Sequence, residues 1–218
     1  PTSDAYHLSL CESEGTRFAF AGLGLDAAIL NDYHTMQKRL TGSAFEALIH
    51  NVGGYVAATF GMTIPRMVRR WMQRRNTQVR ITNAGGAAYA IQRTPQGGQS
   101  GTLFEPGAVL YEGPVNAVMF GTCPYYGYNI RMLPFAGLDE ERFHLRVSNM
   151  PTARIVGNAR RMWRGSIDHP ELYDFQVDKV QMSFSEPMPY QLAGEAMGLR
   201  EELTVGRSKN SVDLVRFI

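Results

Sequence analysis

Two acidic residues of this sequence lie one or two positions after glycines that permit a tight backbone turn, which makes their carboxylates the first candidates for chemistry. Asp26 lies in the segment Gly22-Leu23-Gly24-Leu25-Asp26-Ala27, and Glu195 closes the segment Ala193-Gly194-Glu195. A carboxylate held on a tight turn can bind a magnesium ion or orient an attacking hydroxyl group. The simpler alternatives are a solvated turn for Glu195 and, for Asp26, a helix N-cap that accepts backbone N–H bonds.

Other common catalytic signatures are missing from the sequence. It has no G-x-S-x-G elbow, no H-E-x-x-H or C-x-x-C motif, and no glycine-rich loop followed by Lys-Ser or Lys-Thr. We assign no metal site and no catalytic role to its histidines, because they lack the spacing of metal ligands. They are His7, His34, His50, His144 and His169.

Positive charge is concentrated in two stretches without acidic residues, 47–104 and 142–167, although the formal net charge is only +2. A predicted amphipathic helix over residues 63–75 carries Trp71 among its apolar side chains. Such a helix suits an anionic membrane surface or an acidic partner domain, and the alternative is a solvated face over a packed core. The arginines of this predicted surface are Arg66, Arg69, Arg70 and Arg74. The cluster at residues 160–164 permits the same interpretations.

These residues must be positioned by a mainly β (α+β) fold. The chain has 218 residues with 22 glycines and 11 prolines between short runs of β-branched and aromatic residues, which is typical of many turns between strands. Alternating apolar residues predict antiparallel strands, among them an opening β-hairpin with a Glu-Ser-Glu-Gly turn and a strand with Phe143, Leu145 and Val147 on one face. Helical spacing predicts an insertion at about residues 27–75 and a helix over 152–164. A Gly/Gln/Ser segment at 96–101 is expected to be mobile. We predict a single domain over residues 1–218.

Cysteine usage and hydropathy favour a cytoplasmic protein. Two cysteines do not make a disulfide scaffold in a chain of 218 residues. No window offers the ~20 apolar residues of a membrane span, and the first ten residues do not resemble a signal peptide. Peripheral contact with a membrane is the alternative that the arginines leave open.

The order of the motifs resembles the diacylglycerol kinase and sphingosine kinase superfamily of lipid kinases. The matching segments are the G-x-G-x-D-A strand and helix at residues 18–28, the T-G-x-x-x-E helix at 41–55, the Pro-x-Ala turn at 129–136 and the G-E turn at 189–198. The resemblance implies an antiparallel β-sandwich with a helical insertion, the C-terminal half of such a kinase. The Gly-Gly-Asp-Gly-Thr nucleotide loop of the N-terminal half is absent from this sequence.

The resemblance also implies roles for individual residues. Glu195 would face the nucleotide phosphates and the acceptor hydroxyl as a general base or a magnesium ligand through water, and Gly194 would lie beside the nucleotide. Asp26 would contact the polar head of the lipid acceptor, with Gly22 and Gly24 shaping that subsite. The full-length enzyme would use ATP and Mg²⁺, and its partners would be a lipid substrate and the N-terminal nucleotide-binding domain. We expect the isolated chain to be inactive.

Two departures from the family pattern bear on this expectation. Ala193 occupies a position where the family commonly has aspartate, and Asp139-Glu140-Glu141 replaces the usual Asp-Gly after the Pro-x-Ala turn. Ala193 favours a second hypothesis, a non-catalytic β-sandwich module that binds lipid or an anionic membrane surface. Nucleic-acid binding is a third option with a similar charge signature, but the sequence has no RNA-binding motif.

Overall fold

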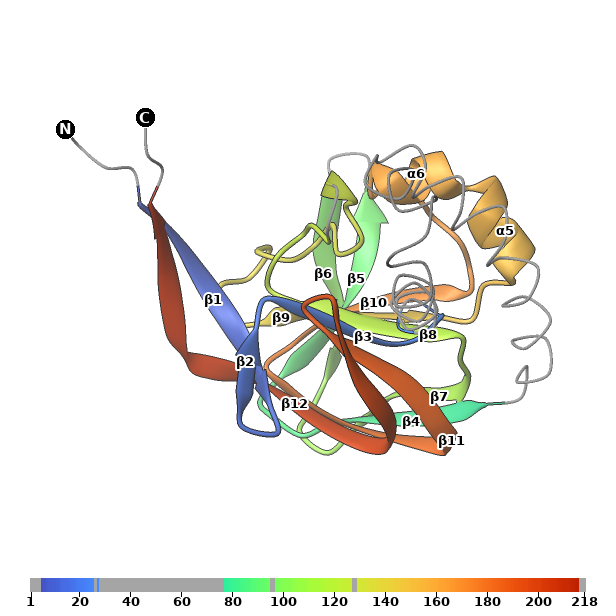
Figure 1. The fold of residues 1–218 in the computed structure, drawn as a ribbon, viewed down its shortest axis with the longest axis horizontal. Helices are drawn as coiled ribbons and strands as arrows, with labels where there is room; N and C mark the ends of the chain where they lie inside the picture. The colour runs from blue at the N-terminus through green and yellow to red at the C-terminus, as the bar shows by residue number, and fades with distance from the viewer. Residues whose placement is uncertain (1–4, 26, 28–76, 95–96, 127–128, 216–218) are drawn as a thin grey trace, which may run out of the picture.

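The computed structural model describes residues 5–25, 27, 77–94, 97–126 and 129–215 (Figure 1). The predicted helical insertion at about 27–75, the arginines Arg66, Arg69, Arg70 and Arg74 with Trp71, and Asp26 lie outside the described residues. Among the helices that the described part contains, none combines the length and the hydropathy needed to cross a membrane.

The described residues form a mainly antiparallel β domain, as the sequence predicts. Its strands are β1 (Ala5–Ser13), β2 (Thr16–Phe18), β3 (Phe20–Gly24), β4 (Gln78–Asn83), β5 (Ala88–Thr94), β6 (Gly97–Phe104), β7 (Val109–Pro114), β8 (Ala117–Gly121), β9 (Phe143–Ser148), β10 (Leu172–Val177), β11 (Lys179–Leu192) and β12 (Glu195–Val215). Two short helices, α5 (Thr152–Gly157) and α6 (Ala159–Trp163), lie between β9 and β10.

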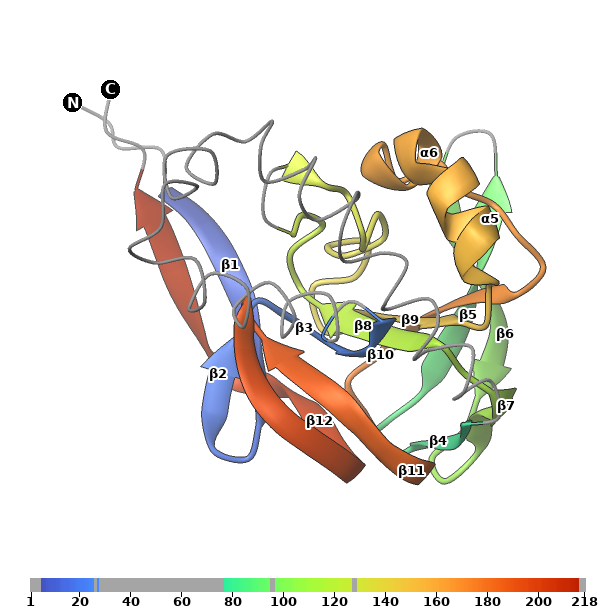
Figure 2. The same ribbon diagram turned by 45° about the vertical axis from the view of Figure 1, so that its right-hand side comes forward.

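The strands belong to one hydrogen-bonded sheet that is not closed into a barrel. Its main path is β2-β1-β12-β11-β3-β8-β9-β10-β5-β6, and β4 and β7 branch from β11. The branch arises because β11 is long enough to pair with two strands on one side: Val180 to Phe184 pair with β4, and Tyr190 to Leu192 pair with β3. Figure 2 shows the strands folded around a common centre, with β1 and the end of β12 extending away from the body.

Strand β8 separates two apolar clusters because its side chains alternate between the faces of the sheet. Val118 and Phe120 belong to the larger cluster, which is built from almost every strand. Ala117 and Met119 face the other way and belong to a smaller cluster with Leu25. The smaller cluster lies on the side covered by Ile155 of α5.

Several local predictions are confirmed and others are corrected. The opening hairpin is present, with Glu14 and Gly15 both at positive φ as a two-residue hairpin turn requires. The predicted helix over 152–164 is interrupted at Asn158, between α5, which ends at Gly157, and α6; glycine and asparagine are both weak helix formers.

The glycine-rich segment predicted to be mobile forms a paired strand in its described part. Residues 97–104 are β6, which pairs with β5. Its glycines permit close packing, because a Cβ at Gly98 would lie 2.6 Å from the Phe135 ring. Glycine at position 98 therefore allows β6 to pack closely against Phe135.

Candidate functional site

The turn that carries Glu195 is a two-residue β-hairpin between β11 and β12. Leu192 pairs with Glu195, and the two residues between them, Ala193 and Gly194, have φ values of +50° and +92°. Positive φ at both central positions is the geometry of a type I′ turn. Ala193 is the unusual member, because a residue with a Cβ is strained there and glycine, asparagine or aspartate are preferred.

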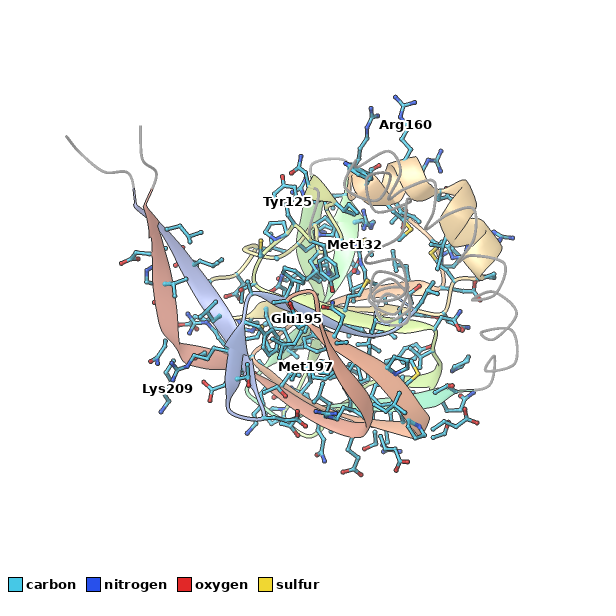
Figure 3. All side chains as sticks on the ribbon, in the orientation of Figure 1. Tyr125, Met132, Arg160, Glu195, Met197 and Lys209 are labelled. Carbon is cyan, nitrogen blue, oxygen red and sulfur yellow. The ribbon has the colours of Figure 1, made fainter. Side chains whose placement is uncertain are left out.

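Backbone and side-chain hydrogen bonds hold this turn against β3. The N–H of Ala193 donates to the carbonyl oxygen of Phe20 at 3.0 Å, and the N–H of Gly194 donates to Oε1 of Gln191 at 2.9 Å. The side chain of Glu195 is exposed at the start of β12, near the centre of the view in Figure 3. A solvent-facing carboxylate on a fixed turn is therefore available to a ligand.

The two glycine-acid motifs, which are about 170 residues apart in the sequence, lie on adjacent strands. Ala21 pairs with Leu192, and Gly22 pairs with Gln191. Gly24 ends β3, and Leu25 after it is helical, so the predicted strand-to-helix junction is present. Asp26 itself is outside the described residues.

The structure requires glycine at position 24. Its φ is +93°, and a Cβ would lie 2.3 Å from the carbonyl oxygen of Asn116 and 2.7 Å from Cε of Met188. The next residue, Leu25, donates its N–H to the same Asn116 oxygen at 3.0 Å. Glycine at this position therefore lets β3 turn tightly against the start of β8.

An apolar cavity of about 90 Å³ begins beside this junction. Leu25, Ala117 and Met119 line one side, and Ile155 and Met162 of α5 and α6 line another. Met132 and Met150 complete a wall rich in methionine, a flexible side chain that adapts to apolar ligands. This cavity could not be predicted from the sequence, because its methionines come from segments that are not neighbours in the chain.

A buried ionic cluster lies behind the cavity. Arg146, which also lines the cavity, donates from Nε and Nη2 to the two carboxylate oxygens of Asp174 at 2.6 and 3.1 Å. Nε2 of His144 lies 2.9 Å from Asp174, and Nη2 of Arg93 lies 3.6 Å from it. Arg146 also donates from Nη1 to the Met132 carbonyl oxygen at 2.7 Å, which fixes the loop before β9.

The electrostatics of this cluster follow from its burial. Burial opposes the negative charge of Asp174, but the positive charge of Arg146 and the hydrogen bonds from His144 and Arg146 outweigh it and hold the pKa of Asp174 far below its usual range. Burial lowers the pKa of His144, although the hydrogen bond to Asp174 opposes this effect. Arg146 and Arg93, both from stretches without acidic residues, thus find a counter-charge inside the domain.

A second, wider cleft of about 790 Å³ lies on the other side of this cluster. Arg93, Arg131 and Asp168 provide its charged groups, and Gly165 and Ser166, just after α6, form part of its wall. Arg93 donates from Nη1 to the Gly165 carbonyl oxygen at 3.4 Å. Two adjoining hollows, one apolar and one polar, therefore flank the C-terminal end of α6.

No group of three or more histidine, cysteine, aspartate or glutamate side chains that could hold a metal ion occurs among the described residues. Within the described part of the chain, the Glu195 carboxylate therefore belongs to no such group. Ala193, its neighbour on the turn, provides no second one.

Comparisons with known proteins give a match in structure alone. No family model matches the sequence, and no curated protein matches it. A structure described as "a putative diacylglycerol kinase from Bacillus anthracis str. Sterne" aligns with a TM-score of 0.52 and 14% identity over 94% of this chain and 55% of that chain. Another, described as a diacylglycerol kinase from the same organism, gives a TM-score of 0.50 and 12% identity over 95% of this chain and 53% of that chain.

At this level of identity the likeness shows that the chain shares its fold with these proteins. The chain spans about half the length of the solved structures that it matches.

Proposed function

We propose that this chain is the C-terminal, acceptor-binding half of an ATP-dependent lipid kinase. The observation that supports the proposal is the register of β3 against β11, in which Gly22 pairs with Gln191, close in sequence to the turn that carries Glu195. The apolar cavity that begins at Leu25 supplies a site for part of an acyl chain within one residue of Asp26. The solved structures that share the fold support the same class.

In this proposal Glu195 orients the acceptor hydroxyl or accepts its proton. Phosphoryl transfer depends mainly on positioning and charge neutralisation, and an exposed carboxylate on a hydrogen-bonded turn suits both tasks. ATP and Mg²⁺ would be held largely by the N-terminal half of the enzyme, because the described residues offer Glu195 without a cluster of further metal ligands. Magnesium would neutralise the phosphate charge, and Gly194 would let a phosphate approach the backbone.

The test is an ATP-dependent lipid phosphorylation assay on the complete protein and on this chain alone, with diacylglycerol and a sphingoid base in mixed micelles. We expect turnover from the complete protein and none from the chain alone. Glu195→Gln should lower kcat by about 100-fold or more, in the range of lost catalytic groups. Glu202→Gln is the matched control, because Glu202 is exposed on the same strand.

Ala193 supports one competing function, a lipid-binding module without catalysis. The same assay separates the two. If the complete protein binds the lipid but transfers no phosphate, and Ala193→Asp restores no activity, the binding module is the correct function.

A further inference from the structure

Helix α6 presents an exposed basic surface with a tryptophan at its C-terminal end. Arg160 and Arg161 of the helix and Arg164 directly after it are exposed, and Trp163 is 46% exposed. Figure 3 shows Arg160 projecting outward from α6. Arg131 is exposed beside them, since its backbone N–H donates to the Trp163 carbonyl oxygen at 3.0 Å. We call Arg131, Arg160, Arg161, Trp163 and Arg164 the α6 surface.

The fold does not neutralise these charges as it does elsewhere. Arg80 pairs with Glu112, Arg146 with Asp174, and Arg200 with Glu14. Within the described ranges, by contrast, Arg160, Arg161 and Arg164 have no carboxylate at ion-pair distance. No acidic residue occurs in the sequence from residue 142 to 167, so the helix and its flanks bring none with them.

On its other side, helix α6 borders the apolar cavity and the wide cleft. Met162, between Arg161 and Trp163, lines the apolar cavity, and Gly165 and Ser166 line the wide cleft. One helix therefore separates an outward cationic surface from the two hollows. A helix with its side chains is about 10 Å across, so a flat partner on the α6 surface would come within that distance of the apolar cavity.

An exposed tryptophan surrounded by arginines matches the chemistry of an anionic lipid bilayer. The indole ring places its apolar body in the headgroup region while its N–H stays hydrated, and the guanidinium groups bind lipid phosphates. We propose that the α6 surface docks this protein on anionic membranes, with Trp163 inserted at the headgroup level. The docking is a property of the surface and does not depend on the proposed kinase activity.

The test is co-sedimentation of the chain with vesicles of phosphatidylcholine containing 40 mol% phosphatidylglycerol, and with vesicles of phosphatidylcholine alone. Each arginine near an anionic surface strengthens binding by about fivefold. Arg160→Ala/Arg161→Ala should therefore weaken binding to the anionic vesicles by about 25-fold. The matched control, Lys179→Ala/Lys209→Ala, removes the same charge from exposed positions on β11 and β12 and should stay within about twofold of the parent. Figure 3 shows Lys209 far from Arg160.

Trp163 supplies an independent readout. The sequence has two tryptophans, so a Trp71→Phe variant reports on Trp163 alone. Its emission should shift to the blue on anionic vesicles and be quenched by lipids brominated near the headgroup. An unshifted emission, or equal weakening in the arginine and lysine variants, would overturn the proposal. So would tighter binding to a 20-nucleotide RNA that is lost with the same arginines, which would assign the surface to nucleic acid. Circular dichroism confirms that each variant is folded.

Discussion

Gly24 lies so close to Asn116 that a Cβ on Gly24 would be 2.3 Å from the Asn116 carbonyl oxygen. The contact joins the end of β3 to the segment that leads into β8, and the same oxygen accepts the N–H of Leu25. It fixes where the chain leaves the sheet and enters the segment that contains Asp26.

Replacing Gly24 with alanine should therefore cost far more than the loss of glycine flexibility. We expect Gly24→Ala to lower the free energy of unfolding by about 3 kcal/mol or more, because backbone strain and a clash with a backbone oxygen act together. Gly194→Ala is the control, since Gly194 has nearly the same φ, +92°, but no atom within 4 Å of the added Cβ. It should cost about 1–2 kcal/mol. Urea denaturation measures both free energies of unfolding, and an equal loss in Gly24→Ala and Gly194→Ala would contradict the steric explanation.

The turn before Glu195 should be stabilised by residues that accept a left-handed backbone. Ala193 has a φ of +50°, a left-handed conformation in which its Cβ is strained. Asparagine tolerates this conformation better, so Ala193→Asn should raise the free energy of unfolding by about 0.5–1 kcal/mol. Ala196→Asn, at an exposed position on β12, should not stabilise the domain. Thermal and urea unfolding measure both. Destabilisation by Ala193→Asn would mean that the turn differs from type I′.

Acid should destabilise the domain partly through His144. Burial lowers the pKa of His144 in the folded state, so below about pH 6.5 the unfolded chain binds a proton there before the folded one does. The free energy of unfolding should then fall with decreasing pH, by up to about 1.4 kcal/mol per pH unit from this group. His144→Gln retains an N–H donor for Asp174 and should flatten the dependence between pH 7 and 5. If the free energy of unfolding of His144→Gln depends on pH as steeply as that of the parent, His144 is not the source of the pH dependence.

Breaking the buried ion pair should cost more than breaking an exposed one. Asp174→Asn leaves Arg146 buried without its counter-charge and should lower the free energy of unfolding by about 3–5 kcal/mol at pH 7. Glu112→Gln removes the partner of Arg80 at the surface and should cost less than about 1 kcal/mol. The Asp174 contribution should persist at neutral pH and fade as the pH falls below about 4, because its folded pKa lies below the unfolded value. Urea titrations at pH 7 and pH 3 test both statements.

Filling the apolar cavity should separate ligand binding from stability. Ala117 lines the cavity, so Ala117→Leu should weaken binding of a fluorescent diacylglycerol analogue without loss of the folded state. Ala196→Leu adds the same side chain at an exposed position and should leave binding unchanged. If Ala117→Leu binds the analogue normally, the cavity is not part of the acceptor site.

The parts of the fold that depend on neighbouring residues could be predicted from the sequence. The opening hairpin follows from Glu14-Gly15, strand β9 follows from alternating Phe143, Leu145 and Val147, and the junction after Gly24 follows from the glycine spacing. Adjacent placement of the two glycine-acid motifs could not be derived from their local sequence, because the pairing of β3 with β11 joins positions about 170 residues apart.

Other features depend on contacts that local patterns do not encode. Residues 97–101 have the composition of a flexible linker, yet Phe135 and β5 require the small size of glycine there. The alternating polar residues of β9 look like a solvated face, but His144 and Arg146 are buried against Asp174. Their partner is 28 residues or more away, on β10, and nothing near them in the sequence indicates it.

The pairing of β1 with β12 has a consequence for how the chain folds. Ala5 pairs with Val215 and Leu8 with Val212, so these contacts close loops of more than two hundred residues, whereas β11 and β12 meet across a two-residue turn. Loop closure carries an entropic cost that grows with length, and sheets rich in distant contacts fold slowly. We therefore expect the β11–β12 hairpin to form more readily than the pairing of β1 with β12.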